Sequence, residues 1–168
     1  MLKVRKYPDP VLARPAQPVR RIDAQLRSLV EEMFETMHKE KGVGLAAPQV
    51  GQSIRLSVVN PTGKKGDGLI LINPVIVESS GEQLEEEGCL SVPGIRTNVP
   101  RAAHVRVRAY GPDGDELDIE ADGLLARVFQ HELDHLNGRL FFHRLNDAAR
   151  MTIRARLKAL EDKFQGES

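Results

Sequence analysis

Apolar residues recur at helical spacing in three stretches of the chain, so the sequence predicts three helices. The first begins after Asp23, which is suited to cap a helix, and ends near Gly42. Its apolar positions are Leu26, Leu29, Val30, Met33, Phe34 and Met37. A second helix is predicted from about Gly123 to Asn137, and a third over residues 146–164. Each helix is expected to pack one face against the core.

Between the first two helices the pattern changes to that of β-strands. Residues 54–59 and 69–77 are apolar runs of strand length, and residues 105–109 alternate apolar with polar side chains. The sequence Gly-Pro-Asp-Gly at residues 111–114 favours a turn, and a second alternation follows at residues 117–119. The last two stretches are therefore predicted to form a β-hairpin.

Length and composition predict one folded domain over residues 1–168, because a chain this long can bury most of its apolar surface in a single core. A hydrophobic fraction of 40% with 29% charged residues is typical of a folded domain and argues against disorder. Residues 1–22 contain four prolines, so we expect an extended N-terminal arm there rather than a helix.

The charge balance narrows the classes of partner. The chain has 24 Lys and Arg residues against 24 Asp and Glu residues, so no net field attracts it to DNA or to a membrane surface. No apolar run reaches the length of a membrane span, and the N-terminus lacks the apolar core of a secretory signal. We therefore expect no direct DNA binding, no membrane contact and a cytoplasmic location.

The segment His131-Glu132-Leu133-Asp134-His135 carries the clearest chemical signal. On a helix, His131 and His135 lie on one face and can reach the same metal ion. Glu132 beside them could take a proton from water that the metal has made more acidic. Leu124 and Val128 share the histidine face, so this face is expected to point inward. An ordinary amphipathic turn with two satisfied histidines is the alternative, and a third ligand has to decide between them.

Three residues are candidates for that ligand. In the long metalloprotease pattern a third histidine follows the segment, but Phe141 stands at that position, which disfavours this class of protease. Glu161 lies on a terminal helix of mixed charge, where a solvated surface role is expected. Cys89, the single cysteine, is the better candidate, since a thiolate with two imidazoles binds zinc or ferrous iron and leaves a coordination position open. Its alternative role is that of a small buried apolar residue.

Three motifs in the same order resemble those of the peptide deformylase family. They are GVGLAAPQ at residues 42–49, EGCLS at residues 87–91 and QHELDH at residues 130–135. Shorter flanking matches are INP (72–74), VPR (99–101), EADGLLA (120–126) and LNGRLF (136–141). The resemblance covers nearly the whole chain and is greatest to the bacterial type that ends in a helix.

The resemblance implies a metal centre and a reaction. Cys89, His131 and His135 would hold one divalent ion, with Glu132 as general base and then as proton donor to the leaving amine. The implied metal in cells is ferrous iron, and zinc, nickel or cobalt can occupy the same ligands. The implied reaction is the removal of the N-formyl group from the initiator methionine of new polypeptides, with release of formate.

The resemblance also implies how the substrate is bound. The Gln49 side chain and the Leu90 backbone N–H would bind the formyl oxygen as a small oxyanion site. The Gly44 carbonyl would accept a hydrogen bond from the substrate amide, and Arg96 would contact the peptide beyond its first residue. The remaining residues that we predict in the substrate pocket are Val43, Leu124 and Val128.

Some positions depart from the family pattern. Arg127 and Glu85 stand where apolar residues are expected at the methionine pocket, and we expect the two to pair across its rim. Gly94 replaces what is often a larger residue beside the groove. Glu87 is expected to form an ion pair with Arg101 as a structural brace.

The expected partners are N-formylmethionyl nascent peptides and the ribosome, which the resemblance places against the basic face of the C-terminal helix. A merely solvated face is the alternative for that helix, and a monomer is expected. The predicted fold is α+β, with antiparallel and mixed sheets around the helix that carries HExxH, plus an N-terminal and a C-terminal helix. Two other functions stay open: a metallopeptidase, and a non-catalytic binding module stabilised by a metal.

Overall fold

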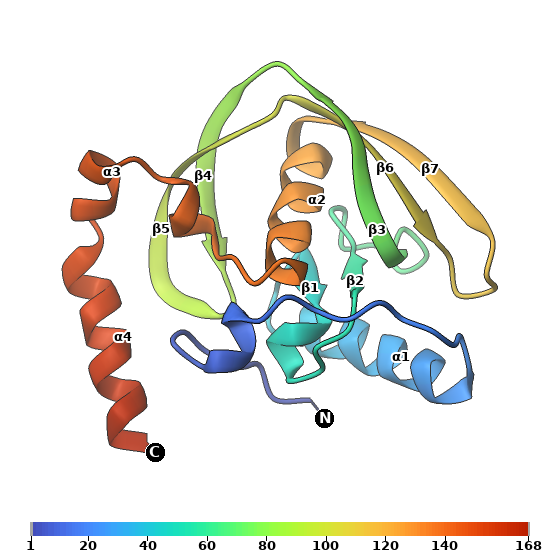
Figure 1. Ribbon diagram of the computed structural model, residues 1–168, viewed down its shortest axis with the longest axis horizontal. Coiled ribbons are helices and arrows are strands. Elements are labelled where there is room, and N and C mark those ends of the chain that lie inside the picture. Colours follow the sequence, from blue (N-terminus) through green and yellow to red (C-terminus); the bar gives the residue numbers. More distant parts are fainter. Residues whose placement is uncertain (1, 168) are drawn as a thin grey trace.

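The computed structural model describes residues 2–167 and has a five-stranded sheet with the order β1-β2-β3-β6-β7 (Figure 1). Its strands are β1 (Gly44–Ala46), β2 (Leu56–Val59), β3 (Leu69–Ser80), β6 (His104–Tyr110) and β7 (Glu116–Asp122). Neighbouring strands in it pair antiparallel, and a parallel bridge joins Gln17 to Ile54. The predicted α+β class with antiparallel strands is confirmed.

The predicted hairpin is present as β6 and β7. Val107 pairs with Ile119 across it, and the Gly111 N–H donates to the Asp115 carbonyl at 2.8 Å where the chain turns. The apolar–polar alternation was a sufficient signal here, because one face of these strands is buried and the other faces solvent.

A second hairpin, β4 (Gln83–Cys89) with β5 (Val92–Arg101), was not predicted. Its side chains do not alternate in the usual way, since Leu84 is 61% exposed whereas Glu87 is only 6% exposed. A strand that turns an acidic side chain inward and an apolar one outward gives no period-two pattern to detect. This hairpin curves around α2, as Figure 1 shows in light green.

Helices α1 (Ala24–Lys39) and α2 (Gly123–Leu136) agree with the prediction. Asp23 caps α1, because its side chain accepts a hydrogen bond from the Leu26 N–H at 2.9 Å. The two helices cover opposite faces of the larger sheet. Val58 packs in the cluster with α1, and the next residue along β2, Val59, packs in the cluster with α2.

The predicted C-terminal helix is two helices, α3 (Asp147–Met151) and α4 (Arg154–Glu167). Asn146 is the cap of α3, and its side chain accepts from the Ala149 N–H at 2.8 Å. The break falls at two β-branched residues, Thr152 and Ile153, whose N–H groups bond three residues back rather than four. Ile153 is only 2% exposed, so its burial against β5 fixes the position of the break.

Two short 3₁₀ turns position residues of the predicted site. They are η2 (Ala47–Val50), which carries Gln49, and η3 (Phe141–Arg144), which follows α2. A further one, η1 (Pro10–Ala13), interrupts the otherwise extended N-terminal arm. This arm is bonded to the site, because the Tyr7 N–H donates to the Ser91 carbonyl at 2.7 Å. Over residues 2–167, no helix has the combination of length and apolar character needed to cross a bilayer.

Candidate metal centre and active site

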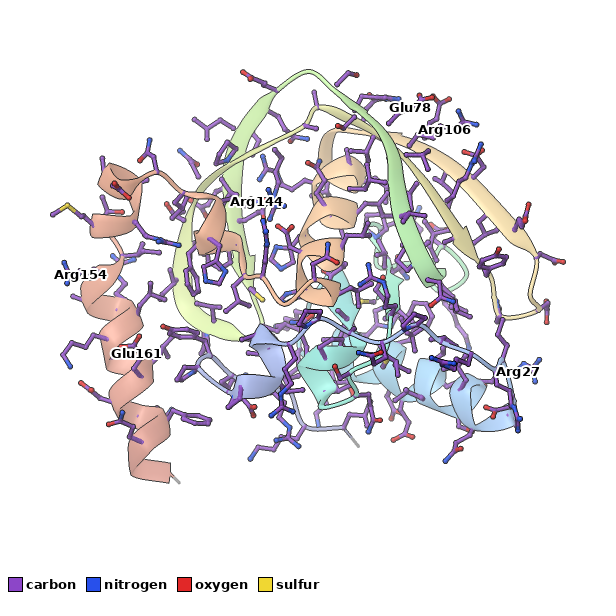
Figure 2. The ribbon with its side chains drawn as sticks, in the orientation of Figure 1. Arg27, Glu78, Arg106, Arg144, Arg154 and Glu161 are labelled. Atoms are coloured by element: carbon purple, nitrogen blue, oxygen red, sulfur yellow. The ribbon has the colours of Figure 1, made fainter. Side chains whose placement is uncertain are left out.

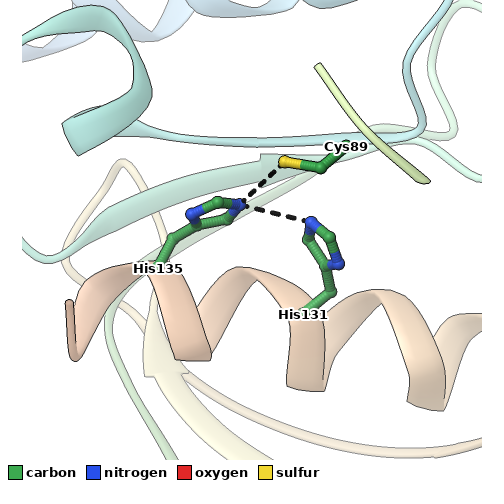
Figure 3. A group of neighbouring side chains, drawn as sticks. All are labelled: Cys89, His131 and His135. Atoms are coloured by element: carbon green, nitrogen blue, oxygen red, sulfur yellow. Dashed lines mark hydrogen bonds between the residues drawn. The ribbon is translucent and has the colours of Figure 1, made fainter. Parts of the chain in front are cut away.

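One helix and one hairpin turn bring the three predicted metal ligands together. His131 and His135 lie on successive turns of α2, and Cys89 ends β4. Cys89 Sγ lies 3.4 Å from His135 Nε2, which lies 3.2 Å from His131 Nε2. Figure 3 shows the thiol and both rings converging on one point, with all three donor atoms within 4.8 Å of one another.

This donor set fits a divalent transition metal. Thiolate and imidazole are ligands that zinc and ferrous iron bind well, and three protein ligands leave a position open for water or substrate. His131 is 9% exposed and His135 is 1% exposed. Ring nitrogens so far from water are costly unless a metal or a hydrogen bond satisfies them. Burial also lowers the pKa of His135 well below its ordinary value, which favours the neutral ring that binds metals.

Glu87 determines which nitrogen of His131 faces the metal position. Its Oε1 lies 2.7 Å from His131 Nδ1. Burial alone would raise the pKa of Glu87, but hydrogen bonds from Arg101 and His131 outweigh that effect and lower it to about 2. An ionised carboxylate can only accept hydrogen bonds, so Nδ1 of His131 must carry the proton. The other nitrogen, Nε2, therefore faces Cys89 and His135, which is the arrangement a metal ligand requires.

The same carboxylate is the centre of a buried ion network. Arg101 binds both oxygens of Glu87 at 2.9 Å, as predicted, and donates to Asp134 at 2.6 Å. Arg144 extends the network from η3, with bonds of 2.5 and 3.1 Å to Asp134 (Figure 2). Asp134 itself lies on α2 between the two histidines in sequence, so the network holds that turn of the helix through Asp134 and through the bond of Glu87 to His131.

The expected pairing of Arg127 with Glu85 is wrong. Arg127 is only 4% exposed and binds Glu87 through Nη1 and Gln83 through Nε, the latter at 3.3 Å. Glu85 is exposed on β4. Because Glu85 and Glu87 are two residues apart on β4, alternation directs both side chains to the same face, and the difference lies in what covers each of them. Glu87 is enclosed by Arg101 and His131. The buried carboxylate is therefore the one that attracts Arg127.

Glu132 lies beside the metal position and is almost fully enclosed. It is 3% exposed, and its Oε1 has no hydrogen-bond partner in the described structure. Burial raises the pKa of Glu132 to about 7, although the neighbouring His131 opposes the shift. A carboxyl group that titrates near neutrality can both take up and release a proton.

Gly44 is required because β1 passes directly against this carboxylate. A Cβ on Gly44 would lie 2.5 Å from Glu132 Oε2 and 3.0 Å from Val128 Cγ1. Any side chain at this position would displace Glu132, so only glycine permits the approach. The structure thus gives a steric reason for this glycine that the sequence pattern did not contain.

Gln49 is held rigidly in η2 and is not the solvated residue that a loop position suggests. It is 2% exposed, and its Oε1 accepts from the Ala46 N–H at 2.9 Å. Its Nε2 donates to Ser91 Oγ at 3.1 Å and lies 3.6 Å from Cys89 Sγ. Ser91 was not among the predicted site residues. Its position two residues after Cys89, within the EGCLS motif, could have identified Ser91 as a site residue.

A cavity of about 700 Å³ opens onto the metal position. The predicted site residues that line it are Val43, Gly44, Gln49, Cys89, Leu90, Arg96, Leu124, Val128, His131 and Glu132. His135 is the exception among the predicted residues, because it lies behind this wall. Leu124 was expected to point inward but is 55% exposed at the rim. Arg96 is also exposed, and its Nε donates to Glu86 at 2.7 Å.

A separate hollow of about 1020 Å³ lies where β3 and β4 approach α2, and none of the predicted site residues lines it. Its wall includes Arg101, Asp134 and Arg144 of the ion network. Two of the three candidate metal ligands, Cys89 and His131, therefore line the smaller cavity, and the ion network lies between the two hollows.

An α+β fold that places a Cys-His-His donor set and a buried glutamate in the wall of an open cavity defines a metal-dependent hydrolase. The family model for polypeptide deformylase matches residues 1–151. The chain belongs to the peptide deformylase family, and it is an enzyme of that family, a metal-binding hydrolase that acts on the N-formyl group of nascent peptides.

Individual relatives agree with this assignment. A peptide deformylase of Acidobacterium capsulatum is 48% identical over 158 residues, which is 93% of each chain. One from Chromobacterium violaceum is 47% identical over 161 residues, covering 96% of both. The crystal structure of a peptide deformylase from Legionella pneumophila matches with a TM-score of 0.90 and 43% identity, over 100% of this chain and 99% of the other.

Proposed function

We propose that this chain hydrolyses the formyl group from the initiator methionine of newly made polypeptides and releases formate. The observation that carries the proposal is the enclosed Glu132 carboxyl group beside the Cys89, His131 and His135 donors, at the closed end of a cavity. Because formylated chains arise during translation, the expected place of action is the cytoplasm. For hydrolysis of a formyl amide, one metal position open to water and one carboxyl group that titrates near neutrality are sufficient.

The proposed metal site consists of Cys89, His131 and His135. A divalent ion bound there would supply Lewis acidity, making water a better nucleophile and polarising the formyl carbonyl. We propose ferrous iron as the metal in cells, with zinc, nickel or cobalt able to replace it, because all of these ions accept this donor set. Glu132 takes a proton from the attacking water on its carboxylate and then passes it to the leaving amine.

Gln49 and Leu90 are proposed to stabilise the oxygen that becomes negatively charged. The Gln49 amide is fixed by its bond from the Ala46 N–H, so its Nε2 is directed toward Ser91 Oγ and Cys89 Sγ, beside the proposed metal position. Leu90 follows Cys89 in the turn between β4 and β5 and lines the same cavity. Donors that are already fixed need no reorganisation when charge develops, which is how such sites accelerate acyl transfer.

The peptide is proposed to lie between β1 and β5. Val43 and Gly44 form one side of the cavity, with the Gly44 carbonyl accepting the substrate amide. Leu124 and Val128 provide apolar contact for the first side chain, and Arg96 at the exposed end contacts the following residues.

One assay separates this activity from its alternatives. Protein loaded anaerobically with ferrous iron or nickel is incubated with formyl-Met-Ala-Ser, and the products are formate or peptide fragments. We expect the wild type to release formate. In Glu132→Gln, kcat should fall by at least about 100-fold, because general acid–base catalysis contributes on that order. Release of peptide fragments would favour a metallopeptidase, and the absence of both products would favour a binding module. Either result would overturn the proposal.

The C-terminal helix is proposed as the contact with the ribosome. Arg154 and Arg156 are exposed on α4, and Figure 2 shows Arg154 pointing away from the rest of the molecule. Glu161 on the other side binds Tyr7 at 2.5 Å, so this helix is attached through its inner face. Exchanging Arg154 and Arg156 for glutamate should weaken cosedimentation with ribosomes at low salt, with peptide turnover unchanged. Undiminished cosedimentation would mean that the face is only solvated.

A further inference from the structure

The two groups proposed to bind the formyl oxygen belong to separate parts of the fold. Gln49 lies in η2, which follows β1 of the five-stranded sheet, whereas Leu90 lies in the turn of the two-stranded β4–β5 sheet. One side-chain bond, from Gln49 Nε2 to Ser91 Oγ at 3.1 Å, joins the two parts directly. Two donors serve one oxygen only if both keep their places, so the contacts that fix the distance between η2 and this turn matter for the reaction.

Pairing within its own hairpin does not fully hold the β4–β5 turn, which consists of Leu90 and Ser91. Cys89 pairs with Val92, so the two turn residues lie outside the ladder. A register shift also falls between Glu87 and Cys89, just before the turn. Such a shift interrupts the ladder and bends the strand locally. The turn therefore depends on contacts from outside the hairpin for its position.

Residues 5–7 of the N-terminal arm, the strap, bind both elements through the backbone. The Arg5 N–H donates to the Gln49 carbonyl at 2.6 Å, and the Tyr7 N–H donates to the Ser91 carbonyl at 2.7 Å. Two N–H groups that are two residues apart on extended backbone lie about 6–7 Å from each other, and side-chain motion does not change that distance. The strap therefore spans the gap between η2 and the β4–β5 turn.

The side chain of Lys6 adds a third bond from the strap. Its Nζ donates to the Leu90 carbonyl at 3.1 Å, so the carbonyl oxygens of both turn residues accept from the strap. The peptide unit between Leu90 and Ser91 is the one that rotates when a two-residue turn changes type. A donor on the Leu90 carbonyl opposes this rotation. Lys6 also lines the same cavity as Gln49 and Leu90.

The strap is itself anchored at both ends. Val4, the residue before it, is only 7% exposed. At the other end the Tyr7 ring packs edge-on against Phe142, with the ring centroids 5.2 Å apart, and the Tyr7 hydroxyl donates to Glu161 Oε1 at 2.5 Å. A short segment that is packed at both ends can hold the turn in place and does not simply follow its motion.

We propose that the strap positions the β4–β5 turn relative to Gln49, so that the Gln49 amide and the Leu90 N–H reach the formyl oxygen together. The strap residues act through these two groups and do not touch the reacting atoms, so they are positioning residues. The inference rests on the proposed function, because the oxyanion roles of Gln49 and Leu90 belong to that proposal. A small displacement of the turn should slow the reaction, since such donors act only at hydrogen-bond distance.

A thioformyl peptide separates this role from a general loss of active enzyme. Sulfur accepts hydrogen bonds more weakly than oxygen, so misplaced donors should slow the thioformyl peptide less than the formyl peptide. The measurement is kcat/KM for release of Met-Ala-Ser from its formyl and its thioformyl derivative by the nickel-loaded enzyme. The formyl-to-thioformyl ratio is taken within one enzyme, so a change in the active fraction cancels.

Two substitutions break the strap at different bonds. Arg5→Pro removes the N–H that binds the Gln49 carbonyl, whereas Arg5→Ala removes the side chain and keeps that N–H. Lys6→Met removes the donor to the Leu90 carbonyl, and Lys6→Arg restores a donor. We expect the formyl-to-thioformyl ratio to fall by about threefold in Arg5→Pro and in Lys6→Met, as the loss of one modest hydrogen bond provides. Arg5→Ala and Lys6→Arg should keep the ratio of the wild type.

Two further variants calibrate the ratio. Gln49→Ala removes a proposed donor itself, so its ratio should fall by at least about tenfold. Lys3→Met removes a positive charge from an exposed position earlier in the arm and should leave the ratio unchanged. If Arg5→Pro does not fold, Lys6→Met and its Lys6→Arg rescue still decide the outcome.

A ratio that falls in Gln49→Ala but stays at the wild-type value in Lys6→Met and Arg5→Pro would overturn the proposal. An equal fall in Lys3→Met and Lys6→Met would also overturn it, because charge and not position would then be the cause. A wild-type ratio in Gln49→Ala would contradict the oxyanion site and the inference with it. Absence of Met-Ala-Ser from both wild-type reactions would instead contradict the proposed function.

Discussion

Arg101 and Arg106 bind carboxylates with the same geometry in different surroundings. Arg101, at the end of β5, donates through Nε and Nη2 to the two oxygens of Glu87, each at 2.9 Å. Its Nη1 donates to Asp134 at 2.6 Å. The side chains of Arg101, Glu87 and Asp134 are 2%, 6% and 5% exposed, so this network is inside the protein.

Arg106, on β6, repeats the pattern at the surface. Its Nε and Nη2 donate to the two oxygens of Asp118, each at 2.7 Å, and its Nη1 donates to Glu78 at 3.2 Å. These three side chains are 31%, 42% and 60% exposed. Figure 2 shows Arg106 and Glu78 next to each other on the outside of the molecule.

Hydrogen-bond geometry alone therefore does not determine how much an ion pair contributes. Water replaces the partners of Arg106 when its bonds break, so its net contribution is small. The partners of Arg101 have no such replacement, because water does not reach them and removal of the arginine leaves Glu87 with Arg127 alone and Asp134 with Arg144 alone. One of those carboxylates, Glu87, also binds His131 of the candidate metal site, so the buried network couples stability to the site.

Arg101→Met should have the largest effect. It removes the cation between Glu87 and Asp134, and breaking a buried pair in this way typically costs about 3–5 kcal/mol. Urea unfolding of the metal-free protein at neutral pH measures the change. The matched control is Arg106→Met, which makes the same substitution on the same hydrogen-bond pattern at the surface. Equal losses of unfolding free energy in the two variants would show that burial does not distinguish the two arginines.

Glu87→Gln should have the second-largest effect, and it should also weaken metal binding. A glutamine can no longer hold His131 Nδ1–H and both arginines as a carboxylate does, so metal affinity should fall by about 10–100-fold. Competition with a metal indicator measures this ratio. Glu86→Gln, one residue earlier on the exposed face, is the control and should leave affinity unchanged. Unchanged affinity in Glu87→Gln would exclude the orienting role.

Glu87 also predicts how stability depends on pH. Its pKa is lowered from 4.5 to about 2 in the folded state, so the folded protein holds this proton less tightly than the unfolded chain. The stabilisation is thus present above about pH 4.5 and is lost as the pH falls toward about 2, amounting to roughly 3 kcal/mol. The measurement is the free energy of unfolding as a function of pH for the wild type and for Glu87→Gln. The difference between the two curves should isolate the contribution of Glu87. A flat difference between pH 5 and pH 2 would contradict it.

Arg144→Met should have a smaller effect. Arg144 also binds Asp134, but its side chain is 43% exposed, so water can partly replace it. We expect a loss of about 1 kcal/mol in unfolding free energy, reduced by added salt because the pair is screened. A loss as large as that of Arg101→Met would mean that Asp134 depends on both arginines equally.

Arg106→Met should have the smallest effect. Its urea midpoint should agree with that of the wild type within experimental error, at low and at high salt, because the charges remain hydrated when the pair is broken. A clear destabilisation would show that the surface network fixes the register of β3, β6 and β7, and would remove the contrast between the two arginines.

Much of the fold could be read from the sequence wherever one face of an element is apolar. The helices α1 and α2 and the β6–β7 hairpin follow from their periodicity. The β4–β5 hairpin could not be predicted, because Leu84 points outward and Glu87 points inward. The break before α4 was also missed, since Ile153 fits the helical period, and the packing of Ile153 in the cluster with β5 is a tertiary contact that the period does not show.

The sequence alone determined the donor chemistry. Two histidines four residues apart must share a helix face, and Cys89 is the only thiol in the chain, so the metal-binding candidates follow from residue type and spacing. Tertiary structure decided what surrounds them, because burial depends on which face the fold covers. It made Glu87, and not Glu85, the buried carboxylate. It also enclosed Arg127 with one donor unpaired, which no local pattern of residues could specify.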